Sequence, residues 1–108
     1  MDGNYMTESE YNELAEVVFM RIEKAIDASG ADIDCNLNGP VMELEFLSGA
    51  KIVINRHTIN QEIWVAAKTG GYHFEYAQGQ WISRRDSCEL FNKLSELVTL
   101  GSGEALTF

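Results

Sequence analysis

Residues 31–46, which read ADIDCNLNGPVMELEF, set the architecture because apolar and polar side chains alternate on both sides of a turn signal. The alternating apolar positions are Ile33, Cys35 and Leu37 before the turn and Met42, Leu44 and Phe46 after it. A period of two is typical of a strand with one buried and one solvated face. Asn38-Gly39 between the two runs is a strong hairpin signal. The stretch therefore predicts two antiparallel strands that share a buried face.

The same pattern continues through the middle of the chain. Turn signals divide it at Ser48-Gly49, Gly70-Gly71 and Gln78-Gly79. The further strands expected cover residues 51–54, 61–67, 72–77 and 80–83. His57 falls in an expected loop, whereas His73 falls on an expected strand. With the first hairpin, this spacing predicts a meander of about six strands.

Helical spacing replaces the alternation at both ends of the chain. From about Thr7 to Ala28 one apolar stripe is formed by Tyr11, Leu14, Ala15, Val18, Ile22, Ala25 and Ile26. Thr7 with Glu10 predicts a capping box, and Gly30 is the expected C-cap. Asp86 followed by Glu89 predicts the start of a second helix, which the glycines at 101 and 103 end.

A helix, a meander and a second helix, without alternating β-α units, favour an α+β fold. We expect a two-layer α/β sandwich in which the N- and C-terminal helices pack on one face of an about six-stranded antiparallel sheet. The 108 residues fit one domain, 1–108. Apolar runs fall short of the roughly 20 residues that span a bilayer. Residues 1–5 resemble neither a secretion signal nor a transit peptide, so we expect a cytoplasmic protein or one that has already been processed.

The net charge of -9 lies entirely in the first 45 residues, which hold 11 acidic and 2 basic side chains. This charge argues against nucleic acid and anionic membranes as partners. At 100° per residue, Glu13, Glu16, Glu23 and Asp27 fall within an arc of about 80°, opposite the apolar stripe. One interpretation is an ordinary solvated helix face. The other is a functional surface, since like charges repel at this spacing, and it would attract hard cations or a basic protein surface.

Other candidate residues are scattered along the chain. Cys35 is interpreted as a small core residue, whereas Cys88 is expected at a helix start, where the pKa of a thiol is lowered. Trp64 is either a binding anchor on the open side of the sheet or packed against a neighbouring strand. Arg56, Lys68, Arg84 and Arg85 are either a cationic rim around Trp64 or solvated charges at strand ends. No phosphate loop, nucleophile elbow or dinucleotide fingerprint is present, so no motif indicates an enzyme.

Several of these runs, in this order, resemble the frataxin family, and in particular its bacterial branch. The resembling runs are residues 31–39, 49–56, 63–68 and 70–74. The resemblance implies the two-layer fold expected above. It also implies ferrous and ferric iron bound weakly on an acidic surface, where we expect other divalent cations to substitute. The implied role is in iron-sulfur cluster assembly, as an iron donor or iron-dependent regulator that docks on a cysteine desulfurase and a scaffold protein.

The resemblance also implies which residues take part. The iron-binding positions are Glu8, Glu10, Glu16, Glu23, Asp27, Asp32 and Asp34, to which helical geometry adds Glu13. The partner-binding positions are Trp64, Asn55, Glu16, Glu23 and Asp27. Compared with the bacterial pattern, Lys24 and residues 28–31 thin the acidic run where the helix meets the first strand.

Three functions follow as hypotheses. The first is a non-enzymatic, iron-binding regulator of iron-sulfur cluster assembly, expected to be a monomer with iron-driven oligomers. The second is a ferroxidase that stores iron as an oligomer. The third is a docking module whose acidic surface meets a basic partner and whose metal binding is incidental.

Overall fold

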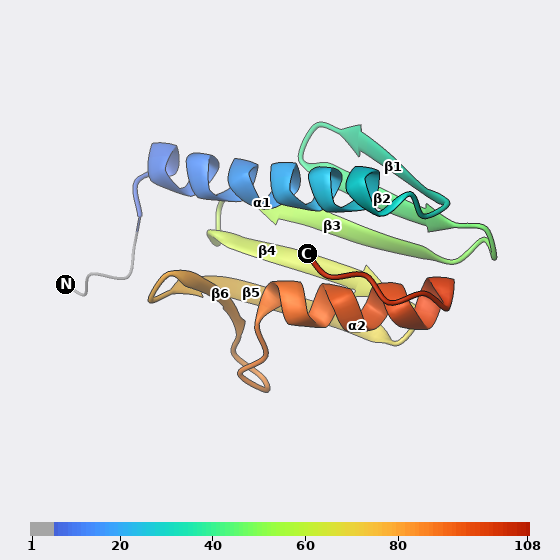
Figure 1. Cartoon of the computed structure of the whole chain (residues 1–108). Coiled ribbons are helices and arrows are strands. Elements are labelled where there is room, and N and C mark those ends of the chain that lie inside the picture. The colour runs from blue at the N-terminus through green and yellow to red at the C-terminus, as the bar shows by residue number, and fades with distance from the viewer. Residues whose placement is uncertain (1–5) are drawn as a thin grey trace.

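The computed structural model describes residues 6–108, and the expectation about a targeting segment concerns residues 1–5, which lie outside this range. Two helices enclose six strands in sequence (Figure 1). The helices are α1 (Glu8–Ser29) and α2 (Leu90–Ser102). The strands are β1 (Ile33–Asn38), β2 (Val41–Phe46), β3 (Lys51–His57), β4 (Glu62–Ala67), β5 (Gly70–Ala77) and β6 (Gln80–Ser83). None of the described helices is long and apolar enough to cross a membrane.

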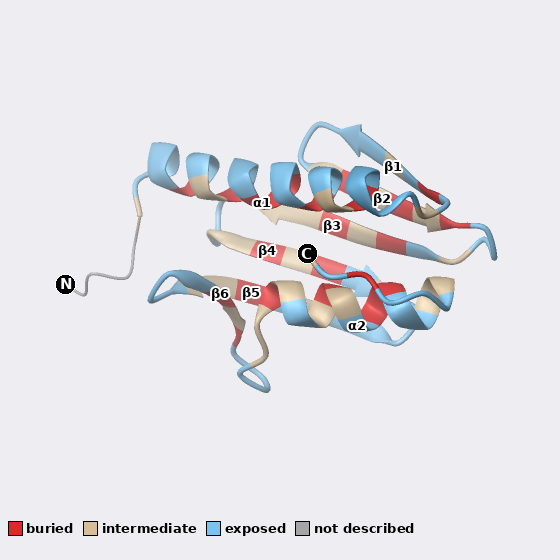
Figure 2. Cartoon of the chain, viewed as in Figure 1, coloured by how far each residue is buried: buried red, intermediate tan, exposed pale blue. Residues whose placement is uncertain are grey.

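The strands form one antiparallel sheet in the order β1-β2-β3-β4-β5-β6. Both helices cover the same face of this sheet, so the predicted two-layer sandwich is confirmed (Figure 1). Buried side chains line the interface between the layers, and the outer sides of the helices are exposed (Figure 2). No helix of residues 6–108 covers the opposite sheet face, which we call the open face.

Two predicted hairpin turns are shifted along the chain. Asn38 pairs with Val41, so the first turn consists of Gly39 and Pro40 instead of Asn38-Gly39. Ala67 pairs with Gly70, so the β4–β5 turn lies two residues before the predicted one. His57 is the last residue of β3, and its prediction as a loop residue was wrong. It pairs with Glu62 and so continues the β3–β4 ladder.

The predicted caps of α1 are present. The Thr7 side chain accepts a hydrogen bond from Glu10 N, and the Glu10 carboxylate accepts one from Thr7 N at 2.8 Å. Gly30 ends the helix with a φ of 70°, the left-handed conformation that glycine tolerates best. The predicted stripe faces the core, although Leu14 and Ala25 are only half-buried. Phe19, which the predicted stripe omitted, is fully buried beside it.

The second helix begins later than predicted. Glu89 is its N-cap, because the Glu89 carboxylate accepts hydrogen bonds from the backbone N–H groups of Phe91 and Asn92. Residues 84–88 instead form a loop that returns to β6, where Ser83 N donates to Cys88 O at 2.8 Å. The other end of α2 lies close to the sheet. A Cβ atom on Gly101 would lie 2.5 Å from the Phe46 ring, so a side chain there would force the two layers apart.

Candidate functional site

The acidic ridge is defined here by the eight predicted iron-binding residues: Glu8, Glu10, Glu13, Glu16, Glu23, Asp27, Asp32 and Asp34. All eight are exposed. Glu13, Glu16, Glu23 and Asp27 lie on the outer side of α1, because the buried side is occupied by Tyr11, Ile22 and the rest of the apolar stripe. The predicted amphipathic pattern therefore exists, and the ridge carboxylates of the helix reach solvent.

Two ridge carboxylates are already engaged. Glu10 accepts the Thr7 N–H in the capping box. Glu16 accepts a hydrogen bond from Arg56 Nη1 at 2.9 Å, and Arg56 Nη2 also donates to Asn12 O. The Arg56 side chain is only 16% exposed, because it comes from the helix-covered side of β3. Glu16 is therefore a structural ion-pair partner as well as a ridge residue.

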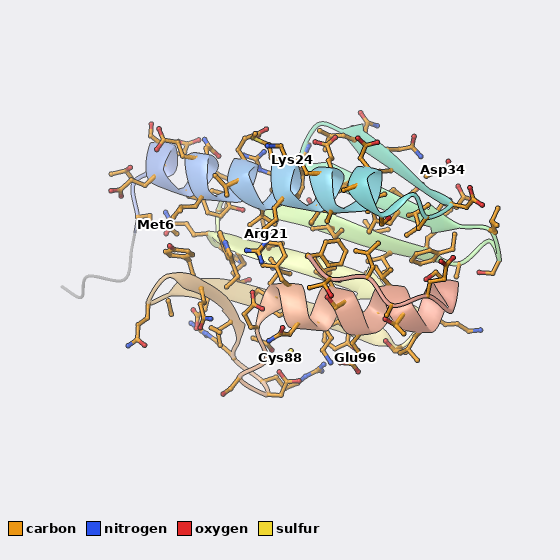
Figure 3. The ribbon with its side chains drawn as sticks, viewed as in Figure 1. Met6, Arg21, Lys24, Asp34, Cys88 and Glu96 are labelled. Atoms are coloured by element: carbon orange, nitrogen blue, oxygen red, sulfur yellow. The ribbon has the colours of Figure 1, made fainter. Side chains whose placement is uncertain are left out.

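The two basic residues of α1 do not neutralise the rest of the ridge. Arg21 turns toward the C-terminal tail, where its guanidinium donates to Phe108 O at 2.7 Å and lies over the Phe91 ring (Figure 3). Lys24 is exposed and makes no ion pair within residues 6–108. The last turn of α1 carries no basic residue, so Asp27 lies at the unfavourable, negative end of the helix dipole. The uncompensated charge is thus a property of the folded surface.

The ridge does not form a single cluster. Ile33 and Cys35 face the core, so Asp34 between them projects from the open face at the edge strand β1, opposite Glu45. Among residues 6–108, no three His, Cys, Asp or Glu side chains gather closely enough to hold a metal ion. Any metal on the ridge would therefore be bound by one or two carboxylates and water.

The two cysteines have raised rather than lowered pKa values. Cys35 is half-buried, and burial, helped by the charge of Glu23, raises its pKa. Cys88 precedes the cap of α2 instead of opening the helix. Burial raises the pKa of Cys88, and the nearby Lys93 ammonium lowers it only in part. The expected activation of Cys88 by a helix N-terminus was therefore wrong.

Trp64 lies at the centre of the open face, between two histidines. The His57 ring stacks on one face of the indole, with 4.1 Å between ring centroids and 6° between planes. The His73 ring stacks on the indole at 4.2 Å and 1°. Trp64 Nε1 donates to Glu62 Oε1 at 2.7 Å. We call these three rings the His-Trp-His stack, and it leaves mainly an edge of the indole accessible.

The acidic side chains around the stack are paired, unlike those of α1. Glu62 is held by Trp64, Glu75 accepts from Arg84 Nε at 2.9 Å, and Glu43 lies 3.4 Å from Lys51 Nζ. Asn55 is the direct cross-strand partner of Trp64 and is half-buried. The two predicted partner-binding residues of the sheet therefore lie side by side.

Sequence reasoning did not identify His57 and His73 as neighbours of Trp64. It also missed Val17 and Met20, which are 60% and 46% exposed on α1. Helical geometry could have identified Met20, because this residue falls inside the arc of the acidic residues. The ridge is therefore an acidic surface with apolar side chains among its carboxylates.

The two-layer sandwich, the acidic helix and the strand-borne tryptophan together define a frataxin-like domain. A sequence model of the frataxin-like domain matches residues 4–104. The chain is 50% identical over 103 residues to the iron-sulfur cluster assembly protein CyaY of Chromobacterium violaceum, covering 95% of this chain and 98% of that protein. The chain therefore belongs to the frataxin family.

Solved structures agree with this assignment. The frataxin of Psychromonas ingrahamii matches with a TM-score of 0.90 and 35% identity, over 94% of this chain and 97% of that one. The trimeric frataxin of the yeast Saccharomyces cerevisiae, solved in complex with ferrous iron, has a TM-score of 0.69 at 24% identity, over 96% of this chain and 92% of that one. At that identity the likeness concerns the fold alone.

Proposed function

We propose that this protein is a non-enzymatic, iron-binding component of iron-sulfur cluster assembly in the cytoplasm. The observation that supports it best is the uncompensated ridge of a chain that belongs to the frataxin family. Repulsion between Glu23 and Asp27, one helical turn apart, destabilises the helix slightly. A protein keeps such an unfavourable repulsion where the surface binds a ligand of opposite charge.

Iron is the proposed cargo of the ridge. Carboxylate oxygens are suitable ligands for hard cations, and a surface without a closed cage binds them weakly, with several waters retained. Glu10 and Glu16 are engaged within the protein, so the proposed binding falls mainly on the other six residues. These are Glu8, Glu13, Glu23, Asp27, Asp32 and Asp34.

The proposed partners are the cysteine desulfurase and the scaffold protein of cluster assembly. Glu16, Glu23 and Asp27 present a field that steers a basic surface onto α1. Trp64 and Asn55 on the open face would make a second contact. The protein would act on the assembly reaction by docking, as an iron donor or as a regulator whose affinity depends on iron.

An anaerobic ferrous titration of labelled protein, followed by NMR at each backbone amide, tests the iron proposal. Paramagnetic broadening is expected at the α1 and β1 carboxylates and should weaken in a Glu23→Gln, Asp27→Asn double variant. Glu104→Gln, which removes an exposed acid away from the ridge, is the matched control. Broadening that is uniform, or unchanged in the double variant, would reject iron binding on the ridge.

Two further measurements separate the alternatives. Oxygen consumption faster than that of free ferrous iron would support a ferroxidase instead. Desulfurase affinity is expected to fall in the Glu23→Gln, Asp27→Asn variant and to change when iron is added. An affinity that falls in the variant but ignores iron would favour a docking module with incidental metal binding.

A further inference from the structure

A hollow of about 250 Å³ adjoins the His-Trp-His stack on the side of His73. Its walls come from β4, β5, the end of β6 and the segment after β6, and consist of Glu62, Gly71, Tyr72, His73, Ser83, Arg84 and Arg85. The His73 imidazole therefore forms one wall of the hollow and also stacks on the Trp64 indole. The hollow is large enough for one side chain of a partner protein.

Basic groups in the hollow offer hydrogen-bond donors. Arg85 Nη2 donates to the Gly71 carbonyl at 3.3 Å, and its guanidinium lies over the Tyr72 ring. That contact leaves the charge of Arg85 without an ion-pair partner among residues 6–108. Arg84 is bound to Glu75. Arginine is suited to carboxylates because its planar fork donates two parallel hydrogen bonds.

The net charge around the hollow depends on His73. Among the described residues, Glu62, Arg84 and Arg85 line the hollow beside His73, and Glu75 is paired with Arg84. The charge of Asp86 acts on Arg85, and Lys93, which is paired with Glu96, lies 5.0 Å from the centre of the Tyr72 ring in the wall. A proton on His73 would add one positive charge to this set. Histidine is the side chain that ordinarily changes charge between about pH 8 and 5. An imidazolium over an indole also gains a cation–π attraction, so the stack survives protonation.

His57 and His73 differ in accessibility. His57 Nδ1 is enclosed and has no hydrogen-bond partner among the described residues. His73 is exposed and lines the hollow. Of the two histidines, His73 is therefore the one that a group in the hollow can contact.

We propose that this hollow is a carboxylate-binding site, occupied by an acidic side chain of a partner protein and strengthened when His73 is protonated. The partner then binds through two groups of opposite charge. A basic segment of the partner contacts the acidic ridge, and an acidic side chain of the partner enters the hollow beside the stack. The assignment of the carboxylate to an assembly protein rests on the proposed function. The existence of the site does not.

The probe for the site is the peptide acetyl-Gly-Glu-Glu-Gly-amide, with its Gln-Gln counterpart as the control. NMR of the full chain should show shifts of the Gly71, His73 and Arg85 amides and of the Trp64 indole N–H with the acidic peptide only. Peptide carboxylates stay ionised at about pH 6. The affinity should tighten about three- to fivefold between about pH 7.5 and 6, the effect expected of one exposed charge pair.

Three variants complete the test. His73→Gln should remove the tightening with pH, and Arg85→Gln should weaken binding at every pH. Lys68→Gln, which removes a cation outside the hollow, should behave as the unmodified protein. Equal shifts with both peptides, or a pH dependence that persists in His73→Gln, would overturn the proposal. Because no iron and no assembly protein is present, failure here leaves the proposed function standing, and failure of the ridge experiments leaves this site standing.

Discussion

Acidic residues have opposite surroundings on α1 and around the His-Trp-His stack of the open face. On the sheet, Glu62, Glu75 and Glu43 each face a donor or a cation on the same surface. On α1, Glu23 and Asp27 are exposed one helical turn apart, while Arg21 is bound to the C-terminal tail. The two regions therefore differ in pairing more than in composition. Unpaired charge, and not acidity alone, distinguishes a surface suited to an external cation.

Glu16 is the exception on α1, and it gives the largest expected effect. Arg56→Met should lower the free energy of unfolding by about 1–2 kcal/mol, because the Glu16 ion pair and the bond to Asn12 O are both lost from a mostly buried guanidinium. Lys51→Met removes an ion pair exposed at both ends and should cost less than about 0.5 kcal/mol. Urea unfolding of both variants measures the difference. Equal losses would mean that Glu16 is as unpaired in solution as Glu23.

The faces of the sheet could be predicted from the sequence, but the neighbours across the strands could not. A two-residue turn at Gly70-Gly71 would pair Trp64 with Ala77, whereas the observed turn pairs Trp64 with His73. The predicted and observed pairings differ by an even number of residues, so every side chain of these strands kept its predicted face of the sheet. Trp64 therefore lies on the open face and also packs against both neighbouring strands. His73 was hidden by the wrong register, and His57 was hidden because the sequence placed it in a loop.

The candidate site shows the same division. Helical periodicity correctly placed Glu13, Glu16, Glu23 and Asp27 on the outer face of α1, because that placement depends on local geometry alone. The pairing of Glu16 with Arg56, 40 residues away, depends on how the helix packs against β3. Periodicity contains no information about such long-range contacts. The binding roles of the ridge, of Asn55 and of Trp64 stay predictions.

A smaller effect is expected where α1 is unpaired. Glu23→Gln with Asp27→Asn should raise the free energy of unfolding by about 0.3–0.5 kcal/mol, because a repulsive pair four residues apart is removed near the negative helix end. The melting temperature should rise by about 2 °C. Added salt should stabilise the unmodified protein through screening and should stabilise the double variant less. Thermal unfolding in low and high salt checks both statements, and an identical salt response would contradict the unpaired ridge.

The smallest expected effect is on the reactivity of one thiol, that of Cys35, which lies within reach of the charge of the acidic ridge. Glu23 raises the pKa of Cys35, so Glu23→Gln should lower that pKa and increase the thiolate fraction at any pH below it. Alkylation of Cys35 by iodoacetamide at about pH 8 should accelerate about twofold, since an exposed charge pair changes such equilibria only modestly. Cys88 is the internal control, because its charged neighbours are Lys93, Asp86, Glu96 and Glu89 and do not include Glu23. Mass spectrometry of both sites follows the two rates in one sample. Acceleration at both cysteines would indicate loosened structure, whereas acceleration at Cys35 alone shows that the unpaired charge of α1 reaches the first strand.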